Sequence, residues 1–436
     1  MRRTLDQWLD YQQQVHPRSI DMGLERVSEV AARLRLGRPA TQVVSVGGTN
    51  GKGSTVAFIE AIARANGLRV GAYTSPHLLR YNERVRIDGR DAGDGALIAA
   101  FALVEAARLA EEDFALTGNT AAAIPLTYFE FGTLAALLLF ADAGLDLAIL
   151  EVGLGGRLDA TNIVAPDVAV ITTVDLDHQD YLGDDREAIG AEKAGILRAG
   201  RPAVLAERDP PSSVLRRAYA IGASAIRGHS DYLVEVDPDG SGWTWREPGF
   251  SIDLPRPALA APSQLDNAAA AIAALRALPI ALDPDAIRRG VANARVAGRL
   301  QVVARDPDIV VDVGHNPQAA RELAGWLAAE PRPTHAVFSA LADKDIAAIG
   351  RILGPHIASW HVAGVTDAGP RGLDGATVAQ RLAPALPAGR ISVHADVAAA
   401  LAAARAALVP GERLLVFGSF HTAADALRAL AAGEPG

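Results

Sequence analysis

The sequence predicts an α/β protein with two domains: an N-terminal doubly wound domain like that of P-loop ATPases and a Rossmann-like C-terminal domain. Three observations support this fold class. Short apolar, β-branched runs alternate with Ala-rich helical segments, as in parallel sheets covered by helices. Glycines and polar residues gather where these runs end. The chain has 436 residues, 50% of them hydrophobic, which suits two or three domains with large cores.

The first strand–turn–helix unit carries the clearest functional signal. Residues 43–46 are apolar and β-branched, residues 47–53 are rich in glycine, and apolar residues then recur at helical spacing. Glycines let backbone N–H groups surround an anion, and the following helix adds its positive end. The match to G-x-x-x-x-G-K-[ST] is imperfect, because the first glycine is absent and Gly53 separates Lys52 from Ser54. The pattern favours a phosphate-binding turn over a turn that serves packing alone.

The alternation continues through the rest of the chain. Residues 231–255 differ, because they alternate in polarity and turn at Asp-Gly-Ser-Gly, which predicts a small antiparallel insertion. In the first domain, placed at 1–296, further strands are expected at 68–75, 145–153, 168–174 and 201–207, and helices at 95–112, 127–144, 185–200, 264–278 and 283–294. In the second domain, placed at 297–436, strands are expected within 308–317, 334–341, 358–365, 390–395 and 413–420, and each is followed by a predicted helical segment.

Composition excludes several classes of protein. The net charge of −9 argues against a nucleic-acid binder held by a general basic field. The chain has no cysteine, so disulfides and thiolate metal sites are excluded. The N-terminal segment lacks the apolar run of a signal peptide, and the most apolar stretch, 133–154, is interrupted by Asp142, Gly144 and Asp146, so no membrane span is expected. The cytoplasm is the expected compartment.

Single polar residues follow several predicted strands. Glu151 ends a buried strand between glycine-rich turns, which favours a magnesium ligand over an ion pair with Arg157. His178 is compatible with a metal ligand, a proton carrier or a satisfied buried histidine. Taken alone, Lys193 is expected to be a solvated or snorkelling side chain. In the second domain, Asp312 and His315 end a buried strand, where helix caps and turn residues are also common.

Taken together, the motifs resemble one family. They are GTNGKGS, SPHLLRYNERVRI, TYFEFGT, EVGLGGRLDATN, DHQDYLG, EKAGI, GRLQV, DVGHNP and DKD, in that order. This set is similar to the folylpolyglutamate synthase/dihydrofolate synthase family of the Mur ligase superfamily, and the resemblance extends from IDMGLERV at 20–27 to FGSFHTA at 417–423. The glycine between Lys52 and Ser54 is itself typical of that family.

The resemblance implies an ATP-dependent amide ligase. ATP would phosphorylate a carboxylate of dihydropteroate or of a folate, and L-glutamate would attack the acyl phosphate. Two magnesium ions are implied, the first bound by Ser75 and Glu151 and the second by His178, with a CO2-derived carbamate on Lys193 close to the second. Lys52, Lys193 and His178 would be the catalytic residues. The implied small-molecule substrates are ATP, L-glutamate, dihydropteroate and reduced folates, with no nucleic-acid or membrane partner, and a monomer is expected.

The binding residues that the resemblance implies fall into three sets. His315 would lie near phosphate or glutamate. Asn267 lies in PSQLDN, where many relatives place the glutamine and asparagine differently. The implied ATP-binding residues are Thr49, Asn50, Gly51, Lys52, Gly53, Ser54, Asn267, Arg299 and Asp312. The implied dihydropteroate-binding residues are Asp21, Met22, Gly23, Thr127, Tyr128, Phe129, Glu130, Leu158, Asp159 and Ala160.

Three other functions are alternatives to this one. A nucleotide-dependent switch would need a purine-specificity motif such as Asn-Lys-x-Asp, which the sequence lacks. A cell-wall Mur ligase would need a further domain ahead of the phosphate loop, which begins only about 47 residues into this sequence. A folylpolyglutamate synthase without dihydrofolate synthase activity is the main alternative within the family.

Overall fold

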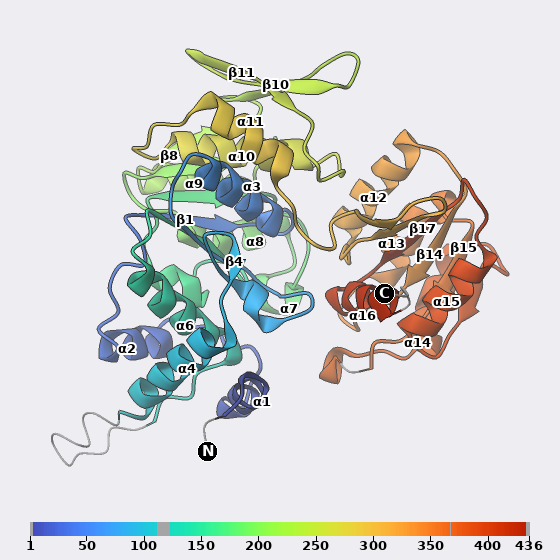
Figure 1. The fold of residues 1–436 in the computed structure, drawn as a ribbon, viewed down its shortest axis with the longest axis horizontal. Coiled ribbons are helices and arrows are strands. Elements are labelled where there is room, and N and C mark those ends of the chain that lie inside the picture. The colour runs from blue at the N-terminus through green and yellow to red at the C-terminus, as the bar shows by residue number, and fades with distance from the viewer. Residues whose placement is uncertain (1–2, 111–122, 367, 433–436) are drawn as a thin grey trace. The chain divides into compact units, whose positions relative to one another are not determined.

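The computed structural model describes residues 3–110, 123–366 and 368–432 and divides into two compact units (Figure 1). The first unit comprises Met1–Ala258 and Leu265–Ala294, and the second comprises Leu259–Gln264 and Arg295–Gly436. Each unit is built on its own sheet with helices on both faces, which confirms the predicted α/β fold class.

Eight strands form the main sheet of the first unit, in the order β4-β3-β2-β5-β1-β6-β7-β8. All neighbours from β2 to β8 are parallel. The strands are β1 Gln42–Gly47, β2 Val70–Tyr73, β3 Val85–Ile87, β4 Arg90–Asp91, β5 Leu147–Glu151, β6 Val168–Ile171, β7 Pro202–Leu205 and β8 Ser224–Arg227.

The edge of this sheet differs from the parallel arrangement that the sequence predicts. Strand β3 pairs antiparallel with both β2 and β4. Asp88 and Gly89, which join β3 to β4, have φ angles of 50° and 73°, so they form the two-residue Asp-Gly connection typical of hairpins. The two strands span only three and two residues, too few to show a periodicity in the sequence.

Helices cover both faces of the main sheet because both faces are apolar. Val43, Ala148 and Leu150 point to the face covered by α1, α2, α4 and α6, whereas the alternate residues Val44 and Val46 point to the face of α3, which packs against α11. The helices are α1 Leu5–Val15, α2 Glu25–Arg33, α3 Lys52–Ala65, α4 Asp94–Leu109, α6 Tyr128–Ala143, α7 Gln179–Leu182, α8 Arg186–Lys193, α9 Ser212–Ala220, α10 Gln264–Arg276 and α11 Pro284–Asn293.

The predicted antiparallel insertion is confirmed as a three-stranded sheet in the order β11-β10-β9 (Figure 1). Its strands are β9 Leu233–Val236, β10 Gly242–Glu247 and β11 Phe250–Pro255. Trp243 and Trp245 on β10 are fully buried, and the Trp245 indole N–H donates a hydrogen bond to the carbonyl of Ala269 on α10. This indole anchors the small sheet to the first unit.

The second unit contains six strands in the order β12-β13-β17-β14-β15-β16, all parallel except the edge strand β12. Phe338, Trp360 and Phe417 pack together in its core beneath α12, α13 and α14. Helices α15 and α16 pack against each other and also contact this sheet. The elements are β12 Gln301–Ala304, β13 Asp308–Val311, β14 Thr334–Phe338, β15 Ser359–Val362, β16 Ile391–Val393, β17 Arg413–Phe417, α12 Pro317–Ala329, α13 Ile346–Leu353, α14 Gly375–Leu382, α15 Val397–Ala407 and α16 Phe420–Ala432.

Helix ends account for most other differences from the sequence prediction. The predicted helix 95–112 runs to Leu109, and its residues 111–112 lie outside the described part of the chain. The predicted helix 185–200 ends at Lys193 and continues as a single 3-10 turn, Ala194–Ile196. The other 3-10 turns are Tyr81–Arg84, Ala160–Ile163, Gly354–His356, Gly369–Arg371 and Ala383–Ala385. Within 3–110, 123–366 and 368–432, every helix is too short or too polar to cross a membrane.

Close packing of α11 against α3 supports the helix that follows the glycine-rich turn, and Gly290 makes this contact possible. A Cβ at Gly290 would lie 2.4 Å from Ile62 Cα. We expect Gly290→Ala to lower the free energy of unfolding by about 1–3 kcal/mol, because the backbone of α3 must shift. Gly95→Ala in α4, where a Cβ would meet no atom within 4 Å, is the control and should be neutral or slightly stabilising. Urea denaturation would measure both, and equal effects would contradict this account.

Candidate functional site

Predicted site residues of the first unit gather at the carboxyl ends of the parallel strands of its main sheet. Parallel strands β1, β2, β5 and β6 end there. The glycine-rich turn follows β1, Ser75 follows β2, Glu151 ends β5 and Thr172 follows β6. In open α/β sheets, ligands bind at the carboxyl ends of the strands.

The turn 48–51 is held in shape by the residues that follow β6. The Thr49 amide donates a hydrogen bond to the carbonyl of Thr173 at 2.7 Å, and the Asn50 amide donates to Thr173 Oγ1 at 3.1 Å. Thr172 Oγ1 donates to the Asn50 carbonyl at 2.6 Å. These bonds fix the backbone of the turn ahead of α3, so its geometry does not depend on the turn sequence alone.

Asn267 packs against the start of α3, although it is more than 200 residues away in sequence. Gly51 precedes this helix with a left-handed φ of 84°, and a Cβ there would lie 2.5 Å from Asn267 Oδ1. The same oxygen lies 3.5 Å from Thr55 Oγ1. The structure therefore brings the predicted ATP-binding residue Asn267 to the glycine-rich turn.

The first turn of α3 carries the polar groups expected of a phosphate site. It consists of Lys52, Gly53 and Ser54. Lys52 Nζ donates hydrogen bonds to the carbonyls of Gly48 and Thr49 at 3.0 and 3.1 Å, so the cation lies over the turn. Ser54 Oγ is buried and has no hydrogen-bond partner among the residues that the structure describes. A buried hydroxyl of this kind fits a further oxygen or metal ligand.

Glu151 is buried, with 4% of its surface exposed, and lies beside Ser75. Its Oε2 accepts a hydrogen bond from the Ser75 amide at 3.0 Å. The Arg157 guanidinium, the alternative partner for Glu151, instead donates to Glu192 at 2.8 Å. Carboxylate and hydroxyl oxygens are ligands that Mg2+ prefers, so Glu151 and Ser75 fit such an ion.

His178 is half-buried and directly precedes α7, with a φ of 51°, and its amide donates to Asp177 Oδ1 at 2.9 Å. Within the described residues, no group of three or more His, Asp or Glu side chains is placed to bind a metal by itself. Mg2+ commonly keeps water and substrate-phosphate ligands and takes only one or two from the protein. The residues present are compatible with that kind of site.

Lys193 is buried in the last turn of α8, with 3% of its surface exposed, so the expectation of a solvated side chain is wrong. Burial, reinforced by the positive charge of Lys52, lowers the pKa of Lys193 to about 7, against the opposing influence of Asp177 and Asp159. An isolated sequence window does not show this, because α8 packs against the 153–157 loop only in the folded chain. The amine is thus available in its neutral form near neutral pH.

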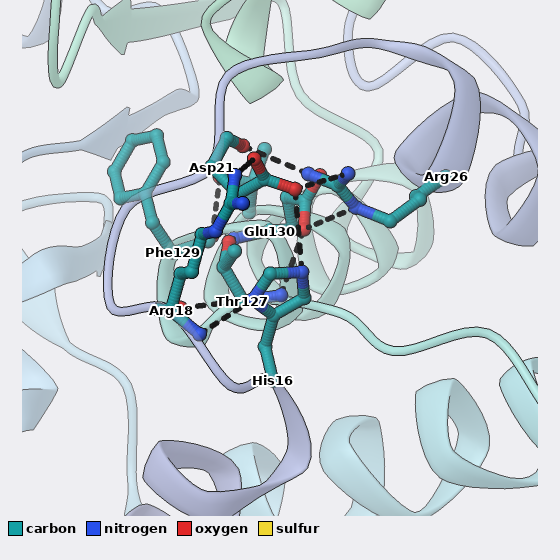
Figure 2. Close-up of polar contacts among 8 residues, drawn as sticks. His16, Arg18, Asp21, Arg26, Thr127, Phe129 and Glu130 are labelled. Atoms are coloured by element: carbon teal, nitrogen blue, oxygen red, sulfur yellow. Dashed lines mark hydrogen bonds and ion pairs between the residues drawn. The ribbon is translucent and has the colours of Figure 1, made fainter. Parts of the chain in front are cut away.

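Two of the three predicted dihydropteroate-binding segments meet in the structure (Figure 2). Asp21 and Glu130 both bind the guanidinium of Arg26. Thr127 and Glu130 form a capping box at the start of α6. Tyr128 is half-buried, and its ring packs edge-on against Tyr81 with centroids 5.8 Å apart.

The third segment, 158–160, lies on the loop after β5. Leu158 is half-buried and Ala160 is buried. Asp159 is buried and accepts hydrogen bonds from the Leu154 amide at 2.9 Å and from the amide and hydroxyl of Thr161 at 3.0 and 2.7 Å. Burial raises its pKa, and these hydrogen bonds oppose the rise. Asp159 therefore stabilises the loop.

In the second unit, Arg299, Asp312 and His315 lie close together. Asp312 is buried and accepts hydrogen bonds from the Leu300 and Gly314 amides at 2.8 and 2.6 Å. Burial raises the pKa of Asp312, and the positive charge of Arg299 opposes this. The Arg299 guanidinium lies over the Phe420 ring, 5.3 Å from its centroid, and His315 lies 6.3 Å from the same ring.

Comparison with known proteins decides the family. The Mur ligase middle domain matches residues 101–275, and the Mur ligase glutamate ligase domain matches residues 298–420. The chain is 44% identical to the dihydrofolate synthase/folylpolyglutamate synthase of Escherichia coli (strain K12), over 99% of this chain and 97% of that protein. The chain belongs to the dihydrofolate synthase/folylpolyglutamate synthase family.

Solved structures of the family share the fold. E. coli FolC in complex with DHPP and ADP matches with a TM-score of 0.90 and 43% identity, over 99% of this chain and 98% of that chain. A bifunctional folylpolyglutamate synthase/dihydrofolate synthase with Mn, AMPPNP and L-glutamate bound matches with a TM-score of 0.88 and 43% identity, over 98% of both chains. The chain thus has the two-domain architecture of Mur ligases.

Several residues that shape the site are not among those that the sequence predicts. Thr172 and Thr173 hold the turn, but nothing in the sequence distinguishes them from the apolar run 168–171 that they follow. The Phe420 ring contacts Arg299 and His315 and lies in the motif FGSFHTA, in which the sequence predicts no site residue. Arg26 lies in the motif IDMGLERV, where only its neighbours 21–23 were assigned.

The contact between Gly51 and Asn267 can be tested with a matched pair of glycines at the two ends of α3. Gly51 and Gly67 have nearly equal φ angles of 84° and 86°, but a Cβ at Gly67 would meet no atom within 4 Å. Either substitution by alanine should lower stability by about 1 kcal/mol through backbone strain. Only Gly51→Ala should also weaken ADP binding, by about tenfold, a loss of about 1.4 kcal/mol, because Asn267 is displaced. Calorimetric titration with ADP measures this, and equal losses in both variants would contradict it.

Proposed function

We propose that this chain is a bifunctional, ATP-dependent amide ligase, which adds L-glutamate to dihydropteroate, giving dihydrofolate, and to reduced folates, giving folylpolyglutamates. Its relative in E. coli bears both activities in its name and aligns with nearly the whole chain. A related structure of similar identity holds AMPPNP and L-glutamate together. These findings favour the bifunctional enzyme over a folylpolyglutamate synthase alone. The observation within this structure that best supports the proposal is the phosphate turn with Lys52 placed over it.

The proposed reaction has two steps. A carboxylate oxygen of the pterin-containing substrate attacks the γ-phosphorus of ATP, which releases ADP and leaves an acyl phosphate. The amine of L-glutamate then attacks the acyl carbon, and the tetrahedral intermediate loses phosphate and a proton to leave the amide. Both steps bring anions together, so preorganised positive charge must account for much of the rate.

The residues of the glycine-rich turn supply part of that charge. Backbone amides of Gly51, Lys52 and Gly53 and the positive end of α3 would bind phosphate oxygens, and Lys52 adds a mobile cation. We propose that Ser75 and Glu151 hold one Mg2+ and His178 a second. When bound, Mg2+ would neutralise phosphate charge and polarise the phosphoryl group. Asn267, Arg299 and Asp312 are assigned to ATP, and His315 to phosphate or glutamate, by resemblance.

Lys193 is proposed to react with CO2. Its neutral amine attacks the carbon of CO2 and loses a proton, giving a carbamate, so the charge of the side chain changes from positive to negative. The pKa of about 7 favours this step, because a fully protonated amine has no lone pair to donate. The carbamate would supply an oxygen ligand next to the second magnesium and remove the repulsion that an ammonium exerts on a cation. We propose that the enzyme acts as a cytoplasmic monomer.

The two activities can be tested in one assay. The protein is incubated with ATP, Mg2+, L-glutamate and either dihydropteroate or tetrahydrofolate, and products are identified by mass spectrometry. We expect a glutamylated product from both substrates. Glu151→Gln should lower kcat for both by about a hundredfold or more, because Mg2+ contributes several kcal/mol and an amide is a poor ligand for it. Product from tetrahydrofolate alone would favour the single-activity alternative, and full activity of Glu151→Gln would make Glu151 structural.

The carbamate on Lys193 can be observed directly. The lysines of this chain are Lys52, Lys193 and Lys344, so 13C NMR with 13C-labelled bicarbonate should be simple to assign. We expect a carbamate signal that weakens as the pH falls below about 7, where Lys193 becomes protonated. The signal should vanish in Lys193→Arg, and the inactive Lys193→Ala should regain some activity with small carboxylic acids. A signal that survives in Lys193→Arg would belong to another amine and would refute the assignment.

A further inference from the structure

We propose that Arg26 is a positioning residue for the pterin-containing substrate: it ties the loop between α1 and α2 to the N-terminus of α6, so that Asp21 and Glu130 hold the site together and do not contact the substrate. This inference rests on the proposed function, because the resemblance assigns 21–23 and 127–130 to dihydropteroate. It changes the expected role of two residues in that assignment and adds a third.

The Arg26 guanidinium donates hydrogen bonds from all three of its nitrogens (Figure 2). Nη1 donates to Asp21 Oδ2 at 2.7 Å, and Nη2 donates to the Asp21 carbonyl at 2.8 Å. Nη2 and Nε also donate to Glu130 Oε1 and Oε2 at 3.0 and 3.4 Å. A planar fork that binds one carboxylate through two nitrogens and a second through a third fixes orientation as well as distance, which a lysine cannot do.

Glu130 is anchored independently of Arg26. Its Oε2 accepts a hydrogen bond from the Thr127 amide at 2.7 Å, and Thr127 Oγ1 accepts one from the Glu130 amide at 3.2 Å. The Glu130 side chain is only 4% exposed. The capping box therefore sets the carboxylate at the start of α6, and Arg26 docks on a fixed partner.

The Asp21 carboxylate has three side-chain nitrogen partners. Besides Arg26, it pairs with His16 Nε2 and Arg18 Nη1, each at 3.3 Å. The His16 ring is held in turn by the Arg18 amide, which donates to Nδ1 at 3.0 Å. Three of the about four lone-pair sites of this carboxylate are therefore used within the protein. Its role is to hold residues 16–26, the loop between α1 and α2 with the start of α2, in a closed turn.

The residues next to these two carboxylates reach the loop after β5. Met22 Cε lies 3.7 Å from the position of a Cβ on Gly155, and Phe129 Cζ lies 2.7 Å from that of a Cβ on Gly153. Phe129 also packs against Tyr73, with ring centroids 5.9 Å apart. Arg26 thus aligns one thioether and one aromatic ring from segments more than 100 residues apart. Such an apolar pair suits the flat ring of a pterin.

Arg33 on the same helix supplies a matched control. Its side chain is 18% exposed against 23% for Arg26, and it donates to Glu29 Oε1 at 3.2 Å and to the carbonyls of Ala107 and Arg108 at 3.2 and 3.3 Å. Arg33 therefore joins α2 to α4 as Arg26 joins α2 to α6, but it touches no predicted substrate segment. Both variants to glutamine should lose similar stability.

The test compares KM values for each substrate. Arg26→Gln should raise the KM for dihydropteroate by about tenfold or more, as expected for loss of a charge-assisted bond, and leave the KM for ATP and for L-glutamate within about twofold. Arg26→Lys should recover only part of the loss. Arg33→Gln should leave every KM near the wild-type value. Glu130→Gln keeps the acceptor for the Thr127 amide, and its effect should not add to that of Arg26→Gln.

Each contrary outcome has a defined meaning. An unchanged KM for dihydropteroate in Arg26→Gln, an equal rise in all three KM values, or an equal rise in Arg33→Gln would overturn the positioning role. If the wild type used tetrahydrofolate alone, the bifunctional proposal would fail, and the KM for tetrahydrofolate would test Arg26 by the same comparison. A wild-type protein inactive on both substrates would overturn both proposals.

Discussion

The conformation of the turn 48–51 is the constraint on which the rest of the first unit depends. A turn that binds phosphate must hold its backbone in one conformation. Fixing the backbone costs conformational entropy, and a glycine-rich segment is not rigid by itself. This turn is held in place from two sides. Thr172 and Thr173, beyond β6, bind the backbone of the turn, and Asn267 closes the space beside Gly51. The sheet order, with β6 next to β1, is what brings those threonines within reach.

Buried charge is concentrated at the same sheet edge. Glu151, Asp159 and Lys193 are each less than 5% exposed, and each would be costly to bury without partners or a function. Asp159 is satisfied by loop hydrogen bonds. Lys193 has its pKa lowered to about 7, which makes it chemically different from an ordinary lysine. The chain carries lysine at only three positions, one at the start of α3 and one buried here, so arginine supplies most other positive charge. The ammonium of lysine is a compact charge that can lose its proton, which the guanidinium of arginine does not do.

Arginine, conversely, connects the segments of the first unit that are proposed to bind substrate. Arg26 binds two carboxylates and a carbonyl at once, so the 16–26 turn and the start of α6 form one assembly (Figure 2). Such half-buried, multidentate contacts resist solvent better than exposed ion pairs do. Rigid support of this kind lets nearby apolar side chains hold a fixed position, which is what recognition of a flat ring requires.

The sequence alone determined the α/β class, the antiparallel insertion and the glycine-rich turn between β1 and α3, because periodicity and glycine chemistry are local and lie within single segments. The strand order and the hairpin at Asp88-Gly89 needed the structure, since β3 and β4 are too short to leave a periodic signal. The burial of Lys193 and the contacts of Arg26 were likewise decided only by the tertiary structure. Arg26 and Glu130 are 104 residues apart. Whether a charged side chain is solvated or paired depends on which distant segment packs against it, and no local pattern of residues records that.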